Sequence, residues 1–334
     1  KQLDNFAPQA LSNVLLAYAK AGETDPRLFE KVANHIVALG DLNDFVSQEL
    51  SNTVWAFGKA GVFHPALFEK VANHILALDN LGTFDGQALA NTVWAFEKAG
   101  VSNPRLFEKV AEHVVALDHL NDFAPQAFSN VSLAYAKAEV SHPALFEKIA
   151  DHIVALDNFK DFAPQAFSNT VWAYAKAEVS HPALFEKIAN HVVALGHLND
   201  FFSQELSNTV WAFAKAGESH QQLFDKVANH ILSLDSLMAF NVKDCSQILD
   251  GYATADIINR QLFERVAKHA MTHIDYASLD KRSQLNLLWA FQKAEKASKK
   301  PQPESKVREV EKKIQELEAK IAALKDDDER EADK

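Results

Sequence analysis

The chain has 334 residues, of which 48% are hydrophobic, and its formal net charge is −11 at pH 7. Its one cysteine, Cys245, excludes a disulfide framework and a thiolate metal cluster. No apolar run reaches the roughly 18 residues of a membrane-spanning helix, and no signal or transit segment is visible in the sequence. The acidic balance disfavours bulk attraction to phosphate, so the placement of the basic residues matters more than their number.

A repeat of 39 residues dominates the chain, and a phenylalanine opens each copy: Phe6, Phe45, Phe84, Phe123, Phe162, Phe201 and Phe240. A fixed period of this size is typical of stacked helical-repeat arrays, in which each repeat contacts only its neighbours. We therefore expect an all-α solenoid, a superhelix of two-helix repeats, over residues 4–297. It comprises seven full repeats and a half repeat from about 277. The sequence does not fix the hand of the superhelix.

The helix boundaries can be read from the first repeat. Its first helix, which we call helix A, is predicted from Pro8 to Ala21, with Gly22 as the C-terminal cap. Its second helix, helix B, starts at Asp25-Pro26 and runs to about Leu39. Later repeats begin helix B with His-Pro or Asn-Pro. The seventh repeat departs from the pattern, with Asp250 in the place of a tryptophan, so it either caps the array or interrupts it locally.

The composition changes after residue 297. Residues 298–305 read as a linker, 306–325 as an amphipathic heptad helix and 326–334 as an acidic, frayed tail. The heptad seam alternates steps of three and four: Val307, Val310, Ile314, Leu317, Ile321 and Leu324. Packing against the last repeat and formation of a homodimer through this helix are equally compatible with the pattern. An appended segment that is not native to the protein also fits its regularity.

Helix A carries two opposite faces when its residues are placed at about 100° each. In the second repeat, Leu50, Thr53, Val54 and Phe57 lie together and are expected to form the core against helix B, between flanks of small residues. In helix B we expect Leu67, Phe68, Val71, Ile75 and Leu78 to be buried, and Glu69, Lys70 and Asn73 to face outward.

The face of helix A opposite the core repeats one polar and aromatic pattern, which we call the A-helix stripe. In the second repeat it consists of Gln48, Asn52, Trp55 and Lys59. The other members are Gln9, Asn13, Leu16 and Lys20; Gln87, Asn91, Trp94 and Lys98; Gln126, Asn130, Leu133 and Lys137; Gln165, Asn169, Trp172 and Lys176; Gln204, Asn208, Trp211 and Lys215; and Asn286, Trp289 and Lys293. In a two-helix solenoid such a face usually lines the concave groove.

This stripe has two interpretations. Tryptophans stack on bases, Asn and Gln hydrogen-bond to base edges and Lys binds phosphate, so the stripe predicts single-stranded RNA at about one base per repeat. Leucines at positions 16 and 133 would then set a different base preference. Alternatively, the asparagines form a hydrogen-bonded ladder between successive A helices, and the tryptophans pack between the same helices. A groove of this kind, or an acidic convex face, also suits protein partners, as in a scaffold or a structural subunit of an organellar complex.

Two segments carry a family resemblance: Phe123-Ala124-Pro125-Gln126 and Asn169-Thr170-Val171-Trp172-Ala173. With the Pro-started helix B that follows, they resemble the octotricopeptide repeat family, which is related to the arrays of RAP-domain organellar proteins. The resemblance spans residues 4 to about 294. One departure is His-Pro-Ala-Leu-Phe-Glu, where the family usually has Pro-Pro-Pro-Glu-Trp. The resemblance implies an organellar RNA-binding protein that controls transcript maturation, stability or translation, in the chloroplast rather than the mitochondrion.

Signals of catalysis and of metal or cofactor binding are lacking. No phosphate-binding glycine-rich loop, nucleophile elbow or acid–base pair stands outside the repeat register, so we expect a non-enzymatic protein without cofactors. Seven histidines share one position in helix B: His35, His74, His113, His152, His191, His230 and His269. Neighbouring helices lie about 8–10 Å apart, too far to share one metal readily. We expect these histidines at the edge of the core, and Cys245 as a packing residue.

Overall fold

The computed structural model describes residue 3 and residues 5–273, with the side chains of 271–273 excepted, and these residues form fourteen helices without a strand. The A helices are the odd-numbered elements: α1 (Pro8–Ala21), α3 (Ser47–Ala60), α5 (Gly86–Lys98), α7 (Pro125–Ala138), α9 (Pro164–Ala177), α11 (Ser203–Lys215) and α13 (Val242–Thr254). The B helices are α2 (Pro26–Ala38), α4 (Pro65–Ala77), α6 (Pro104–Ala116), α8 (Pro143–Ala155), α10 (Pro182–Ala194), α12 (Gln221–Ser233) and α14 (Arg260–His273). No described helix has the length and apolar character needed to cross a membrane.

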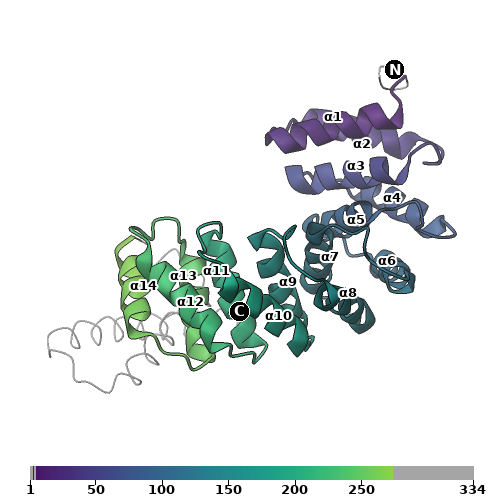
Figure 1. The fold of residues 1–334 in the computed structure, drawn as a ribbon. Coiled ribbons are helices and arrows are strands. Elements are labelled where there is room, and N and C mark those ends of the chain that lie inside the picture. The colour runs from purple at the N-terminus through teal and green to yellow at the C-terminus, as the bar shows by residue number, and fades with distance from the viewer. Residues whose placement is uncertain (1–2, 4, 274–334) are drawn as a thin grey trace, which may run out of the picture. The chain divides into compact units, whose positions relative to one another are not determined.

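The helices form two compact units, each described by itself. The first unit consists of the described residues up to Phe201 together with Lys215–His220. The second unit consists of Phe202–Ala214 and the described residues from Gln221 onward. In the first unit the A helices α1, α3, α5, α7 and α9 pack one against the next, and the B helices α2 to α10 form a second layer in the same order (Figure 1). This arrangement is an α-solenoid, so the predicted fold class is confirmed.

The ends of the helices follow the predicted signals. Helix α1 begins at Pro8, and Gly22 closes it in the left-handed conformation with φ of 72°, which glycine adopts at little cost. Helix α2 begins at Pro26, and the Asp25 carboxylate accepts the backbone N–H of Leu28. In α4, α8 and α10 a histidine takes the place of Asp25, and its Nδ1 accepts the equivalent N–H, as His64 does from Leu67. These contacts satisfy N–H groups that lack partners within the helix.

The core lies between helix A of one repeat and helix B of the preceding repeat. Phe29 of α2 meets Phe57 of α3 edge to face, with ring centroids 5.0 Å apart. The same pair recurs one repeat later as Phe68 and Phe96. Leu50, Thr53, Val54 and Phe57 are all buried, as predicted. In three repeats the helix A residue of the pair is a tyrosine whose hydroxyl donates to the carbonyl of the helix B phenylalanine: Tyr135 to Phe107, Tyr174 to Phe146 and Tyr252 to Phe224.

Two predictions about helix B are wrong. Leu78 is half-buried rather than buried. Lys70 does not point outward into solvent; it is half-buried, and its Nζ donates to the carbonyls of Val37, at 2.9 Å, and Leu39 in the preceding repeat. Equivalent bonds join Lys109 to Leu76 and Leu78, Lys148 to Leu117, and Lys187 to Val154 and Leu156. The last carbonyls of an α-helix have no intrahelical donor and carry partial negative charge, so an ammonium group is stabilised there. These lysines join successive B helices.

The second unit keeps the same arrangement despite its divergent sequence. Arg265 of α14 takes the place of the joining lysine, and its guanidinium donates to the carbonyls of Leu232, at 2.7 Å, and Leu234. A Cβ on Gly251 would lie 3.0 Å from the backbone of Val210, so α11 and α13 approach closely at this glycine. The predicted half repeat, linker, heptad helix and acidic tail all lie outside the described residues.

Candidate nucleic-acid interface

The A-helix stripe lies at the surface of the repeats. In α3, α5, α7 and α9 each Gln and Lys of the stripe is exposed and each Asn is half-buried. Trp55, Trp94 and Trp172 are half-buried as well, and so is Leu133 in α7. Each of these A helices thus presents an exposed Gln amide, a half-buried Asn amide, a half-buried tryptophan or leucine and an exposed ammonium group. Within the second unit, Gln204 is exposed, Trp211 is half-buried and Asn208 is buried.

The stripe asparagines bear on the two interpretations of the sequence. None of the amides of Asn52, Asn91, Asn130 and Asn169 hydrogen-bonds to another residue in the described part of the chain. A ladder between A helices would require such bonds. In the second unit the Gln247 amide does reach Asn208 Oδ1, at 3.4 Å. The four asparagines of the first unit therefore hold amide donors and acceptors at a partly open surface, a position in which a ligand can satisfy them.

Contacts between successive A helices involve the tryptophans of the stripe. The rings of Trp55 and Trp94 lie 5.9 Å apart with planes inclined at 31°. The Lys137 ammonium lies 6.0 Å from the ring centroid of Trp172 on the next A helix. Both contacts join successive repeats, so the stripe is continuous along α3 and α5 and along α7 and α9. These tryptophans are half-buried, so packing holds them in place while part of each side chain stays exposed.

The stripe lysines differ in their partners. The Lys176 ammonium forms an ion pair with Glu139 at 3.2 Å, and Lys215 forms one with Glu178 at 3.0 Å. Within the described residues, Lys59, Lys98 and Lys137 have no carboxylate within 4.0 Å of Nζ. The charges of Lys137 and Lys98 act on Glu97, whose side chain is half-buried. Burial raises the pKa of Glu97, and the two lysines lower it to a smaller extent.

Sequence analysis missed the two acidic partners of these lysines. Glu139 and Glu178 cap α7 and α9 in the left-handed conformation, with φ of 55° and 56°. The corresponding caps of α1 and α3 are Gly22 and Gly61, and Gly100 holds the same register after α5. A glutamate at a register position that glycine holds in the first three repeats and in the sixth is visible in the repeat alignment. Its contact with a lysine 37 residues later follows only from the stacking of the A helices.

Several predicted residues lie outside the described part of the chain. They are Asn286, Trp289 and Lys293 of the stripe, and Val307, Val310, Ile314, Leu317, Ile321 and Leu324 of the heptad seam. Their predicted roles therefore stay predictions.

The histidines of helix B lie at the edge of the core, as expected. Burial lowers the pKa of four of them, which we call the helix B histidines: His74, His113, His152 and His191. His191, for example, packs 5.0 Å from Phe167. Among the described residues, His, Cys, Asp and Glu form no group of three that could hold a metal ion. Cys245 is buried, and burial raises the pKa of its thiol to about 12.

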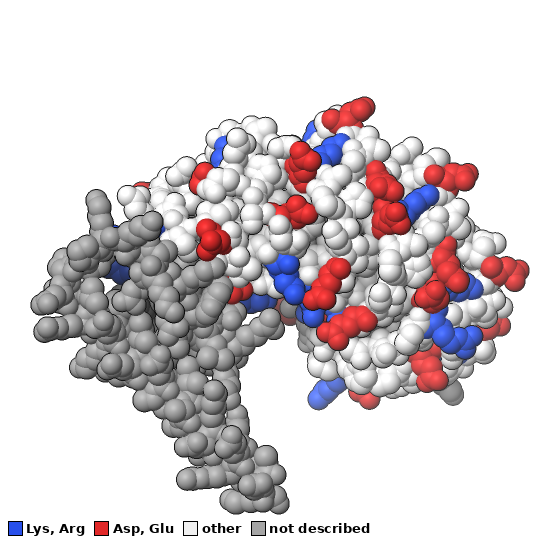
Figure 2. Space-filling view, turned by 90° about the horizontal axis from the view of Figure 1, so that it is seen from below, with Lys and Arg blue, Asp and Glu red and all other residues white. Residues whose placement is uncertain are grey.

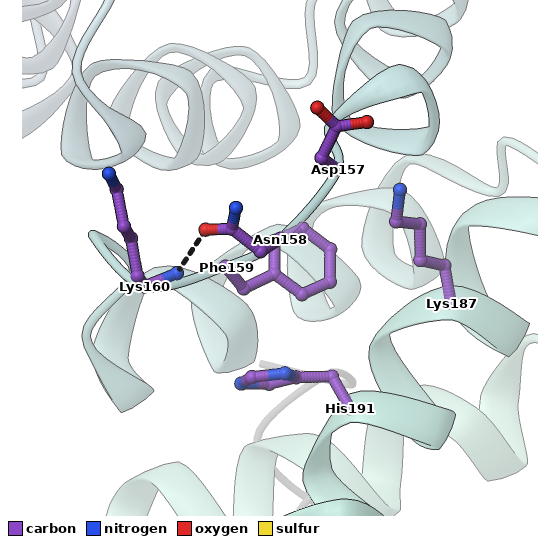
Figure 3. A pocket seen from close by; sticks show the side chains of 6 residues that line it. All are labelled: Asp157, Asn158, Phe159, Lys160, Lys187 and His191. Atoms are coloured by element: carbon purple, nitrogen blue, oxygen red, sulfur yellow. Dashed lines mark hydrogen bonds between the residues drawn. The ribbon is translucent and has the colours of Figure 1, made fainter.

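A shallow hollow of about 440 Å³ lies away from the stripe, beside the loop between α8 and α9 (Figure 3). Phe159 forms its floor, with the Lys187 ammonium 5.5 Å from the ring centroid and His191 on the other side at 5.1 Å. Lys187 already binds the last carbonyls of α8, and the Lys160 backbone N–H donates to Asn158 Oδ1. Lys187 and Asn158 thus already have partners within the chain.

Comparison with known proteins identifies the family of the chain. A family profile described as RNA-editing substrate-binding complex 6 protein matches residues 1–200, which contain α1 to α10 and the stripe of the first unit. No curated protein matches the chain. The profile does not confirm the more specific resemblance to octotricopeptide repeats, although both indicate a helical array with an RNA-related role. The chain belongs to the family of RNA-editing substrate-binding complex 6 proteins.

Proposed function

We propose that this protein is a non-enzymatic RNA-binding protein that holds single-stranded RNA along the A-helix stripe of its first unit. The observation that carries the proposal is the set of half-buried asparagine amides without hydrogen-bond partners among the described residues, each one turn from a half-buried aromatic or apolar side chain. Unpaired polar groups next to accessible rings suit a base, which offers both an edge for hydrogen bonds and a face for stacking.

The expected chemistry assigns one role to each position of the stripe. Tryptophan stacks on a base, at about 1–3 kcal/mol per base. Asn and Gln hydrogen-bond to base edges, and the lysine at the end of the helix binds the phosphate between neighbouring nucleotides. Other helical-repeat RNA readers bind about one base per repeat, and we propose the same spacing here.

The family supports an RNA-related role, because its description names an RNA-editing substrate-binding complex. We propose that the chain acts on organellar transcripts, in their maturation, stability or translation. The family description does not favour the chloroplast over the mitochondrion, so the chloroplast preference rests on the octotricopeptide resemblance alone.

Fluorescence anisotropy with a pool of short randomised RNAs tests this proposal. The test variant replaces Asn91, Asn130 and Asn169 by alanine. The matched control replaces three exposed helix B asparagines by alanine: Asn73, Asn190 and Asn229. We expect salt-sensitive RNA binding by the wild type and the control, and at least tenfold weaker binding by the stripe variant. Equal binding by both variants, or no binding at low salt, would refute the proposal.

Leu133 offers a sharper test of base reading. It occupies the tryptophan position of the stripe in α7 and is half-buried like the tryptophans of α3 and α5. If each repeat reads one base, Leu133→Trp changes the preference at a single position of the bound RNA. Sequencing of RNAs selected by the two proteins measures this change. A uniform change along the RNA, or none, would contradict the one-base-per-repeat arrangement.

A second function is a protein scaffold, and the charge of the chain favours it. The net charge is −11, and the face seen in Figure 2 shows more acidic than basic side chains, dispersed among uncharged ones. The family description also names a complex, in which protein partners are expected. Partners with basic surfaces would bind such a face. Absent or salt-insensitive RNA binding, together with capture of such a partner, would favour this function over the first.

A further inference from the structure

The caps of α7 and α9 differ in side chain and charge from the glycines of the earlier repeats. Glu139 and Glu178 are non-glycine residues in the left-handed region, while the same register holds Gly22, Gly61 and Gly100 in the first three repeats. Side chains with a Cβ disfavour this conformation. Each of the two glutamates therefore occupies a position for which glycine is the better-suited residue, and each places a carboxylate beside a stripe lysine of the next A helix.

The two carboxylates occupy the place that a phosphate would take. Glu139 Oε1 lies 3.2 Å from Lys176 Nζ, and Glu178 Oε1 lies 3.0 Å from Lys215 Nζ. Lys215 holds the pKa of Glu178 below its ordinary value, first through their hydrogen bond and then through its charge, so this side chain is ionised at neutral pH. RNA binding gains free energy when lysines neutralise phosphates and thereby release the cations condensed on the RNA. An ammonium that is already paired with a carboxylate must give up that partner before it can neutralise a phosphate, so it contributes less to this release.

The earlier lysines of the stripe lack such an acid. The residue 37 positions before Lys59 is Gly22, that before Lys98 is Gly61 and that before Lys137 is Gly100. All three lysines are exposed, and among the described residues none has a carboxylate within ion-pair distance. The stripe is therefore electrostatically asymmetric: its lysines are open to phosphate at α3, α5 and α7 and are occupied at the C-terminal ends of α9 and α11.

We propose that Glu139 and Glu178 set the extent of the phosphate-binding site, by occupying Lys176 and Lys215 so that RNA phosphates are bound at Lys59, Lys98 and Lys137. The two glutamates act as specificity-determining residues: they restrict the phosphate contacts to the N-terminal repeats and leave the later repeats to contact bases through Asn169 and Trp172. This inference rests on the proposed RNA-binding function of the same stripe.

The test replaces both glutamates by the neutral isostere, in the variant Glu139→Gln/Glu178→Gln. Both side chains are exposed, so the variant is expected to fold as the wild type does. A control with the same change of net charge, Glu147→Gln/Glu186→Gln, alters exposed helix B residues. RNA affinity is measured by anisotropy between 50 and 200 mM salt, a range of about fourfold that resolves differences in counterion release.

Two newly available lysines are expected to steepen the slope of log K against log salt by about 1.4, at about 0.7 per single-stranded phosphate contact. The affinity then falls about sevenfold more than that of the wild type over the same fourfold rise in salt. The helix B control keeps the wild-type slope. In the wild type, Lys59→Ala/Lys98→Ala flattens the slope by about 1.4 and Lys176→Ala/Lys215→Ala leaves it unchanged. When Lys176→Ala/Lys215→Ala is added to the Glu139→Gln/Glu178→Gln variant, the wild-type slope is expected to return.

The outcomes separate this inference from the function on which it rests. If the wild type binds RNA and the glutamine variant has the same slope, the inference is overturned and the RNA-binding function stands. If only the glutamine variant binds, the glutamates block the site and the inference holds. If neither protein binds RNA at low salt, both are overturned. A slope that changes equally in the helix B control assigns the effect to net charge and overturns the role of the two caps.

Discussion

Replacement of Ser132 by valine is expected to stabilise the protein. Ser132 lies in α7 with 0% of its surface exposed, and its hydroxyl oxygen has no hydrogen-bond partner among the residues that the structure describes. Four of the equivalent residues in other repeats are fully buried valines, Val54, Val93, Val171 and Val210, and the other two are buried leucines. The repeat thus accommodates a valine at this register.

The size of the effect follows from two contributions. A buried hydroxyl without a partner costs about 1–3 kcal/mol, and the change to valine removes that cost. Valine also buries an additional methyl group, which contributes about 0.8 kcal/mol. Some of this gain is offset where the neighbouring side chains must move. We therefore expect the free energy of unfolding to rise by about 2 kcal/mol.

Urea unfolding monitored by tryptophan fluorescence and by circular dichroism measures the change, with both probes used because repeat arrays need not unfold in one step. Thr170→Val is the matched control. Thr170 is equally buried, but its hydroxyl donates to the Ala166 carbonyl at 2.7 Å, so its replacement removes a satisfied group. A midpoint for Ser132→Val that is unchanged or lower, or a larger gain for Thr170→Val, would refute the reasoning.

Three further predictions concern the core and its pH dependence. Tyr135→Phe is expected to lower the free energy of unfolding by about 1 kcal/mol, because the hydroxyl donates to the Phe107 carbonyl at 2.6 Å; urea unfolding checks this, and an equal loss in the exposed control Tyr18→Phe would contradict it. Gly86→Ala is expected to cost about 1–3 kcal/mol, because its Cβ would lie 2.5 Å from Phe123 Cγ, whereas Gly196→Ala meets nothing within 4 Å; equal thermal midpoints would exclude the predicted clash. The stability should fall as the pH drops below 6.5, the ordinary pKa of histidine, because burial lowers the pKa of the helix B histidines in the folded state and the unfolded chain therefore binds protons first. Thermal midpoints between pH 7.5 and about 5 should decline less in a variant with all four changed to glutamine, and an identical decline would reject this cause.

The sequence alone determined the helices and their ends. The 39-residue period repeats each signal several times, so Pro8, Gly22 and Asp25-Pro26 mark boundaries that later repeats support independently. The helical periodicity also separates buried from exposed positions within each helix, and Leu50, Val54 and Phe57 are buried as expected. These features depend on local backbone preferences and on which face of a helix is apolar, and short stretches of sequence determine both.

The partners of long side chains were decided only by the tertiary structure. Lys70 was expected in solvent, yet it binds carbonyls 31 and 33 residues earlier, and Glu139 meets Lys176 across 37 residues. Whether the stripe asparagines form a ladder also depends on the spacing between successive A helices. Periodicity fixes the side of the helix from which a side chain leaves. The distance and rotation between stacked repeats then decide which atoms it reaches, because a few ångströms separate a hydrogen bond from an open polar group.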